Sequence, residues 1–464
     1  MFNGPESAFR GSVNKINHLI ELTMENRSFD HFLGYLTKDG MPRVDGLPDP
    51  LPTLSGLHAE PIMAHCMDGA DYGFEGPPHE WEQMLESFDG GNNDGFVRAY
   101  QQIYGTSPNF SVPMGYYTKQ TIPVYDALAR EFTLCDRWFG AVLGSTWPNR
   151  KYMNSGVRDD DRETQTVPPF PGFRTTPIFD EIEDAFDEHG RRLTWRCYVS
   201  DLPFLAFWYP FALSHISNFP HIHQFVTDCR EDNLPTISII DPPFQIADDH
   251  PPSDPRLGQK FVGLIVDALT HSDSWRDSAL IITYDESGGF YDHVPPPQIT
   301  TPEHPEDDRL GFRVPALIIS PYSMKAVSHT PFTHTSIIKS ISERWGVQFD
   351  GRFGQRWKDS NGIWGCLDFS ATARQKDCYT GDPREIFAMN WAKDIQGRLT
   401  APATDFERYM ERIFILPELK ALDRRSVVFD NLSQLEQNVI TLKRATIDAT
   451  PHVPGSTVQV ERPS

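Results

Sequence analysis

The 464-residue sequence predicts an α/β fold in which a mostly parallel central sheet has helices on both faces. Short apolar segments rich in β-branched residues are typical of strands buried in a parallel sheet. They alternate with longer segments in which apolar residues recur every three or four positions, as in amphipathic helices. The length suits one large domain with insertions, or two domains.

The expected strands are five segments, which in order are 16–22, 193–199, 236–241, 279–284 and 315–320. Helical spacing of apolar residues is clear in segments 122–139 and 258–272. In parallel sheets of this kind, ligands bind beyond the carboxyl ends of the strands. The residues that follow each expected strand are therefore the first candidates for a functional site.

The composition excludes several classes of partner. With 42 basic and 64 acidic residues, the chain has a formal net charge of −22, which disfavours binding to nucleic acid. No apolar segment approaches the roughly 20 residues that a membrane-spanning helix needs. The N-terminus lacks a secretory signal and a twin-arginine pair. We therefore expect a protein that stays in the cytoplasm, leaves by a route that reads no such signal, or is numbered without its leader.

The six cysteines are widely scattered, and no close pair resembles a zinc ribbon. Most are expected to be reduced residues of the core. Cys366 and Cys378 lie near each other in a polar loop and are the best candidates for a disulfide.

Two expected strands are followed by paired oxygen-bearing side chains. Glu25 and Asn26 come after the first strand, and Asp285 and Glu286 come after strand 279–284 and before a glycine pair that permits a sharp turn. Three carboxylates and one amide oxygen can hold a divalent cation without any cysteine. Either pair alone could equally cap a turn or begin a loop, but their matching positions favour a metal site.

The segment GSTWPNRKY, residues 144–152, presents adjacent hydroxyl groups at Ser145 and Thr146 shortly before a proline. A hydroxyl group next to a divalent cation loses its proton more readily, so a weak nucleophile becomes a strong one. Taken alone, this short sequence is a common turn signal, and the local pattern favours a turn.

Four segments in this order, ENRSFDHFLG, GSTWPNR, DDHPPSD and YDESGGFYDHVPPP, resemble a phosphoesterase family of the alkaline-phosphatase-like superfamily. The family includes bacterial phospholipases C that hydrolyse phosphatidylcholine and a periplasmic acid phosphatase. The short nucleophile turn and the lack of a leader are most similar to its zinc-dependent phospholipase C subgroup. The resemblance implies an alkaline-phosphatase-like sandwich with a catalytic domain at residues 1–350. Residues 351–464 are expected to be a helical C-terminal extension with a loop-rich connector and an extended tail.

The resemblance implies roles for individual residues. The expected metal ligands are Glu25, Asn26, Asp285 and Glu286, together with Thr146, which is also the expected nucleophile. Glu286 is a departure, because relatives have an aspartate there, and Ser145 is the neighbouring alternative for the nucleophile. One divalent metal ion is expected. Oxygen ligands alone suit calcium or magnesium, whereas the subgroup implies zinc.

Further residues are expected around the phosphate. His79 and His250 match histidines of relatives, and either could deliver a proton to the leaving oxygen. His293 is expected to anchor its motif next to the metal ligands. Asp201, where the acid phosphatase has histidines, is expected to bind substrate. Arg150 could bind substrate or could equally pair with a core carboxylate.

The expected activity is hydrolysis of phosphatidylcholine, and of other phospholipids, to diacylglycerol and phosphocholine through a phospho-threonine intermediate. The alternatives are a phosphatase for soluble phosphate esters and a noncatalytic interaction protein on the same scaffold. An acidic protein should prefer zwitterionic to anionic lipid surfaces. The aromatic segment 201–225 could form a choline cage or contact a membrane, although most such residues are ordinarily core. The C-terminal extension could mediate self-association.

Overall fold

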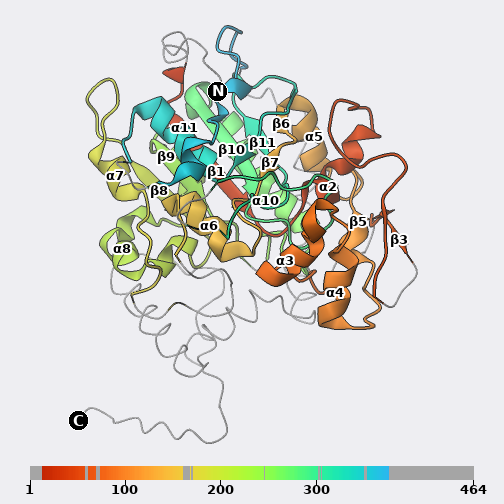
Figure 1. Ribbon diagram of the computed structural model, residues 1–464. Coiled ribbons are helices and arrows are strands. Elements are labelled where there is room, and N and C mark those ends of the chain that lie inside the picture. The colour runs from red at the N-terminus through yellow and green to blue at the C-terminus, as the bar shows by residue number, and fades with distance from the viewer. Residues whose placement is uncertain are drawn as a thin grey trace, which may run out of the picture.

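The computed structural model describes residues 13–57, 61–68, 74–159, 168, 171–244, 246–300, 304, 306–349 and 353–375. At the centre lies a seven-stranded sheet with the order β12-β6-β11-β10-β1-β9-β8 (Figure 1). Its strands are β1 (His18–Met24), β6 (Thr133–Cys135), β8 (Trp195–Tyr198), β9 (Ile237–Ile240), β10 (Ser278–Tyr284), β11 (Leu317–Ile319) and β12 (Val327–Ser328). All five expected strands are present, and the first begins and ends two residues later than predicted.

The sheet is mostly parallel, as predicted. β1 pairs in parallel with β10 and β9, and β9 pairs in parallel with β8. On the other side of β10, β11 is antiparallel to both of its neighbours, β10 and β6. β12 then runs parallel to β6, so only β11 reverses the common direction of the strands.

Three two-stranded sheets accompany the main one. They pair β2 (Thr53–Leu54) with β3 (Ile62–Met63), β4 (His65–Cys66) with β5 (Gly115–Tyr116), and β7 (Trp138–Phe139) with β13 (Phe332–Thr333). The expected helix over 122–139 is wrong in its second half. α5 ends at Glu131, Phe132 adopts an extended backbone, and the chain continues as β6 and β7.

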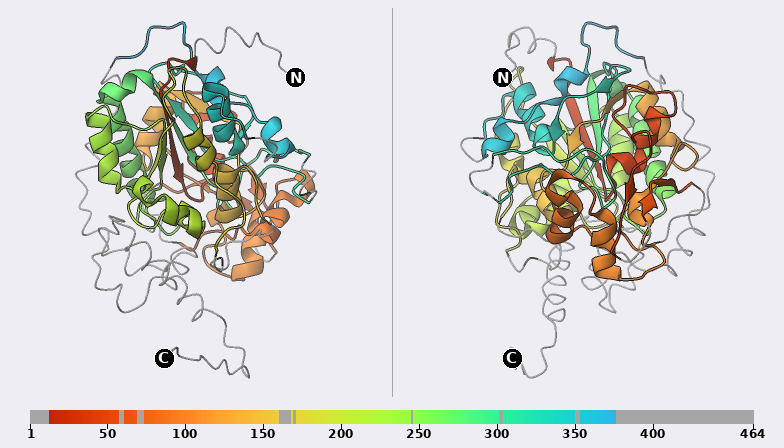
Figure 2. Two further views of the ribbon diagram at one scale, coloured as in Figure 1. Left: turned by 90° about the vertical axis from the view of Figure 1, so that its left-hand side faces the viewer. Right: turned by 45° about the vertical axis from the view of Figure 1, so that its right-hand side comes forward.

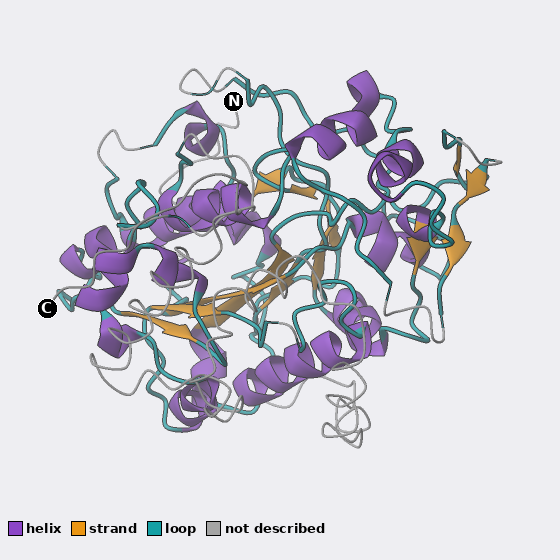
Figure 3. Cartoon of the chain, turned by 90° about the horizontal axis from the view of Figure 1, so that it is seen from below, coloured by secondary structure: helices purple, strands orange, loops and turns teal. Residues whose placement is uncertain are grey.

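Helices cover both faces of the main sheet, which confirms the predicted architecture (Figures 2 and 3). α5 (Pro123–Glu131), α9 (Ile222–Arg230) and α10 (Pro255–Thr270) pack together on one face, and α6 (Thr146–Ser155) and α11 (Thr335–Trp345) lie on the other. The remaining α-helices of the described residues are α2 (Phe29–Phe32), α3 (Trp81–Phe88), α4 (Phe96–Tyr104), α7 (Phe179–Asp184), α8 (Tyr209–Ser214) and α12 (Gln355–Lys358). Because helices cover both faces, all seven residues of β10 are buried.

Of the expected C-terminal extension, the structure describes residues 353–375. There Phe353, Ile363 and Trp364 join the main hydrophobic core. The expected later helices and the tail lie outside the described residues, and the boundary at residue 350 stays a prediction. Among the described residues, no helix is long and apolar enough to cross a membrane.

The five described cysteines are free thiols, in agreement with the expectation of mostly reduced residues. Cys366 is buried, with its Sγ atom 3.9 Å from Sγ of Cys135. Cys378, the other half of the expected disulfide, lies outside the described residues.

Candidate active site

The two expected ligand pairs follow neighbouring strands. β1 and β10 pair in parallel with Met24 opposite Tyr284, so both strands end at the same edge of the sheet. Beyond the last paired residues, the backbone N–H of Asp285 donates to Met24 O at 3.0 Å. The backbone N–H of Asn26 in turn donates to Asp285 Oδ1 at 3.2 Å. The sheet register therefore brings the two strand ends together.

The four expected ligands at these strand ends are all buried, namely Glu25, Asn26, Asp285 and Glu286. Gly288 then turns the chain with a φ of +63°, and a Cβ atom at this position would lie 2.2 Å from Asn26 O. The Gly288 N–H donates to Glu286 Oε2 at 2.6 Å. The glycine therefore permits a close approach that any other residue would block.

The two adjacent hydroxyl groups point to different partners. Thr146 is the first residue of α6, and its Oγ1 donates to Glu25 Oε2 at 3.3 Å. Ser145, directly before the helix, donates from Oγ to Glu80 Oε2 at 2.7 Å. The structure therefore joins the Thr146 hydroxyl, rather than that of Ser145, to the expected metal ligands.

Arg150 lies one turn further along α6 and contacts three buried carboxylates. Its Nη2 is 2.6 Å from Glu25 Oε1, its Nε is 3.2 Å from Asp285 Oδ2, and its Nη1 is 3.2 Å from Asp241 Oδ1. This is the pairing with core carboxylates that the sequence had left open as the alternative to substrate binding. Arg150 holds two of the expected metal ligands in fixed orientations.

The two expected histidines, His79 and His250, lie close together in an edge-to-face arrangement, with ring centroids 5.9 Å apart. The Asn26 side-chain amide donates to His79 Nε2 at 3.0 Å, so His79 Nδ1 carries the proton that is donated to Pro77 O at 2.7 Å. His79 Nε2 also lies 3.8 Å from Glu286 Oε1. His250 donates from Nδ1 to Pro251 O at 2.7 Å.

Asp201 lies three residues after the end of β8. Burial of its carboxyl group, together with the nearby charges of Asp241 and Asp248, raises its pKa well above the ordinary value. Asp248 in turn accepts the Glu25 N–H through its backbone oxygen at 2.8 Å. Asp201 therefore shares an electrostatic environment with the site.

The electrostatics of the strand ends fit a divalent cation. Burial, followed by the charge of Asp285, raises the pKa of Glu25 well above its ordinary value, and burial raises the pKa of Glu286 to about 8. Within the described part of the chain, Asn26 Oδ1 and Glu286 Oε1 are buried without a hydrogen-bond donor. Crowded carboxylates and unpaired oxygens are costly unless a cation compensates them, and hard cations prefer such ligands.

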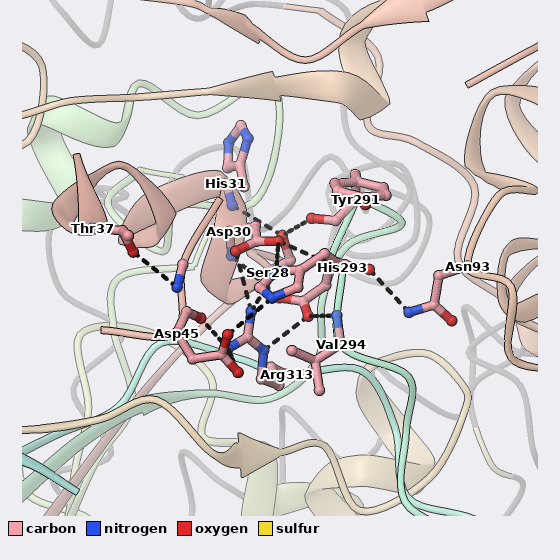
Figure 4. A network of polar contacts seen from close by, with 12 residues as sticks. Ser28, Asp30, His31, Thr37, Asp45, Asn93, Tyr291, His293, Val294 and Arg313 are labelled. Atoms are coloured by element: carbon pink, nitrogen blue, oxygen red, sulfur yellow. Dashed lines mark hydrogen bonds and ion pairs between the residues drawn. The ribbon is translucent and has the colours of Figure 1, made fainter. Parts of the chain in front are cut away.

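A second group of possible ligands, Asp30, Asp292 and His293, lies close enough together to hold a metal ion. Figure 4 shows instead a network of ion pairs. Arg313 donates to Asp292 Oδ1 at 2.8 Å and to Asp30 Oδ1 at 3.1 Å. His293 Nδ1 lies 2.7 Å from Asp30 Oδ2, and the Asp30 N–H donates to Asp292 Oδ2. All four carboxylate oxygens therefore have protein donors, whereas the strand ends leave Asn26 Oδ1 and Glu286 Oε1 without a donor among the described residues, which makes the strand ends the better candidate for a metal.

His293 nevertheless anchors its motif, as expected. Burial opposes its protonation, but hydrogen bonds to Asp30 and Asp45 raise its pKa to about 10. The charged imidazole thereby ties the segment after β10 to the segment after β1.

The aromatic segment 201–225 forms mainly core, the more ordinary of its two interpretations. Phe204, Phe207 and Trp208 are buried and pack around Phe173. Those three aromatic side chains therefore do not form an exposed surface.

Three residues at the site were not predicted, namely Glu80, Asp241 and His334. Asp241 directly follows β9, so the rule that placed Glu25 and Asp285 beyond their strands could have identified it. Glu80 follows His79 directly, but only the fold shows its bond to Ser145. His334 lies between a strand of a different sheet and α11, and no local pattern indicated it.

Comparisons with known proteins identify the family of the chain. A model of the phosphoesterase family matches residues 16–348. Non-specific phospholipase C1 of Arabidopsis thaliana is 32% identical over 373 residues, which cover 72% of this chain and 67% of the relative. Phospholipase C B of Mycobacterium tuberculosis is 31% identical over 402 residues, covering 73% of this chain and 74% of the relative. Among solved structures, the lipoteichoic acid synthase LtaP of Listeria monocytogenes aligns with a TM-score of 0.36 and 10% identity over 85% of this chain and 95% of that chain. The family match spans most of the sequence, and the chain therefore belongs to the phosphoesterase family.

Proposed function

We propose that this protein is a metal-dependent phospholipase C that hydrolyses phosphatidylcholine, and other phospholipids, to diacylglycerol and phosphocholine. The relatives named above are phospholipases C. The single observation that carries the proposal is the contact of Thr146 Oγ1 with Glu25 Oε2, which places a hydroxyl group at the edge of a buried carboxylate cluster. A hydroxyl group at such a place suits nucleophilic attack on phosphorus.

The expected cation would be held by Glu25, Asn26, Asp285 and Glu286, with the hydroxyl group of Thr146 beside them. Asn26 Oδ1 and Glu286 Oε1, which are buried without donors among the described residues, support this assignment. A bound divalent cation would neutralise charge on the phosphate oxygens and favour ionisation of the hydroxyl group. We propose zinc on the resemblance to the zinc-dependent subgroup, although the oxygen ligands alone would also accept calcium or magnesium.

In the first step, the Thr146 hydroxyl group gives up its proton to solvent, Oγ1 attacks phosphorus, and the bond between phosphorus and the diacylglycerol oxygen breaks. The N-terminus of the ten-residue helix α6 lies at this hydroxyl group, and its positive end favours the bound phosphate. His79 or His250 protonates the departing oxygen. For His79 the donating atom would be Nε2, which lies 3.8 Å from Glu286 Oε1.

In the second step, water attacks phosphorus, the bond to Thr146 Oγ1 breaks, and one proton of the water returns to Oγ1, which restores the hydroxyl group and releases phosphocholine. Glu25 accepts the hydroxyl hydrogen bond of Thr146 in the resting enzyme. Arg150 keeps Glu25 and Asp285 oriented through both steps, and we assign it this role in preference to substrate binding. Asp201 stays our candidate for a polar contact with the head group.

Replacing Thr146 with alanine tests the nucleophile. Thr146→Ala should lower turnover of phosphatidylcholine by roughly a thousandfold or more, because a nucleophile cannot be replaced by its neighbours. Ser145→Ala is the matched control, since Ser145 bonds Glu80 and should retain turnover within about tenfold. In a quenched reaction, radiolabelled phosphate should be found on the wild-type protein and not on Thr146→Ala. Near-normal turnover by Thr146→Ala would refute the assignment.

Substrate choice is tested separately with liposomes of defined composition. With its net charge of −22, the protein should turn over phosphatidylcholine faster than phosphatidylserine, because an anionic surface repels it. Faster hydrolysis of the anionic lipid would contradict this preference. Higher activity on a small phosphate monoester than on either lipid would instead identify a phosphomonoesterase.

Metal dependence is tested by elemental analysis of the purified protein. We expect one divalent ion per chain, loss of activity after chelation, and recovery when zinc is added. Full activity in protein shown to be free of metal would overturn the proposed mechanism.

A further inference from the structure

His334 lies at the junction of two sheets. It directly follows β13, which pairs with β7 through Phe332 and Trp138, and it precedes α11. The side chain is completely buried. From this position it reaches the end of β10, although His334 and Asp285 are 49 residues apart in the sequence.

The contacts of His334 define its tautomer. The ring nitrogen Nε2 lies 2.5 Å from the backbone oxygen of Asp285, which can only accept a hydrogen bond. The indole Nε1 of Trp138, which can only donate, lies 3.4 Å from His334 Nδ1. Nδ1 therefore accepts and Nε2 carries the proton. Trp138 selects the tautomer that can donate to Asp285.

This donor completes the contacts of Asp285. β11 pairs with residues 280–282 of β10 and does not extend to Asp285. The Asp285 carboxylate is held by Arg150 and by the backbone N–H groups of Asn26 and Glu286. His334 holds the remaining polar group of this residue, its backbone oxygen.

We propose that His334 is a positioning residue for the metal site. It fixes the backbone at Asp285 so that the carboxylates of Asp285 and Glu286 converge on one cation. The proposal rests on the proposed function, in which Asp285 and Glu286 are metal ligands. Outer partners of metal ligands commonly contribute to metal affinity because they orient the ligands before the metal binds.

Two substitutions separate the donor from the volume of the side chain. His334→Met fills similar space without a donor, whereas His334→Gln retains an N–H group at a reach close to that of Nε2. We expect His334→Met to bind zinc about 10- to 100-fold more weakly than the wild type, and His334→Gln to recover most of the affinity. Affinity is measured by competition with a chromogenic chelator, and thermal unfolding of the metal-free proteins is measured in parallel.

Trp138→Phe provides a second variant that leaves His334 in place. It removes only the donor that selects the tautomer, so zinc affinity should fall less than in His334→Met. The double variant Trp138→Phe/His334→Met should bind zinc as tightly as His334→Met alone, because the indole acts through the imidazole.

The outcomes distinguish three cases. Weakened zinc binding that His334→Gln recovers supports the proposal. Wild-type zinc affinity in His334→Met, with a lowered unfolding temperature of the metal-free protein, would show a purely structural role and overturn it. A wild-type protein that binds no divalent metal would instead refute the proposed function itself.

Discussion

Arg150 Nη2 lies 2.6 Å from Oε1 of Glu25, and both side chains are almost completely buried. Burying a carboxylate is costly unless a cation neutralises it. Arg150 does this for Glu25 while also pairing with Asp241 and Asp285. The cluster therefore contains one permanent cation that belongs to the protein, next to the place proposed for a metal ion.

Removing this arginine should destabilise the protein strongly. Arg150→Met leaves three buried carboxylates without their shared partner, and a broken buried ion pair costs about 3–5 kcal/mol. We expect the free energy of unfolding of the metal-free protein, measured with urea, to fall by this amount. In the double variant Arg150→Met/Asp241→Asn, the free energy of unfolding should fall by less than the sum of the losses in the two single variants, since the two residues are in contact.

An exposed ion pair provides the control for Arg150. Arg276 pairs with Asp232 at 2.9 Å, but its side chain is 64% exposed, so Arg276→Met should cost less than about 1 kcal/mol. If Arg150 chiefly bound substrate, Arg150→Met would raise KM and leave the unfolding free energy unchanged. That result would contradict the orienting role.

Gly288 should not tolerate a side chain. Its positive φ is strained for alanine, and the added Cβ would lie 2.2 Å from the backbone oxygen of Asn26. We expect Gly288→Ala to lower the free energy of unfolding by about 2–4 kcal/mol, because the clash adds to the backbone strain. It should also weaken metal binding, since the Asn26 backbone must move.

Gly346 is the matched control for Gly288. Its φ is +69°, close to that of Gly288, but an added Cβ would meet nothing within 4 Å. Gly346→Ala should therefore show the backbone strain alone, about 1 kcal/mol, with metal affinity unchanged. Equal losses in the two variants, measured by urea unfolding, would mean that the contact with Asn26 contributes nothing.

The sequence was sufficient for the parts of the site that local patterns encode. Glu25 and Asp285 each come directly after a buried strand, and parallel strands end at a common edge, so their meeting could be expected. His334 could not be found in this way, because its contact with Asp285 depends on how a second sheet packs. The role of Arg150 also required coordinates, since only they show which of its possible partners it meets.

The same limit applies to the fold. β6 has three residues, which are too few to show a period, and it follows α5 after only one intervening residue. The apolar pattern therefore predicts a helix that continues to residue 139. The reversed direction of β11 was likewise not predictable, because a buried apolar strand has the same composition in either direction.

His293 should make stability depend on pH in the alkaline range. Its pKa is about 10 in the folded protein, against an ordinary value of 6.5. Between these values the folded state binds more protons than the unfolded state, so the free energy of unfolding falls as pH rises. The contribution of His293 is complete below about pH 6.5 and is lost as pH rises through about 10, with a slope of at most about 1.4 kcal/mol per pH unit.

The measurement compares urea unfolding of the wild type and His293→Gln from pH 6 to pH 10. Glutamine can still bond Asp30 but carries no charge, so the difference in unfolding free energy should shrink steadily as pH rises. Other groups that titrate in this range cancel in the difference. His271→Gln is the control, because His271 is an exposed residue at the end of α10. The free energy of unfolding of His271→Gln should change with pH in the same way as that of the wild type. A constant difference between the wild type and His293→Gln would show that the imidazole is not held in its charged form by Asp30 and Asp45.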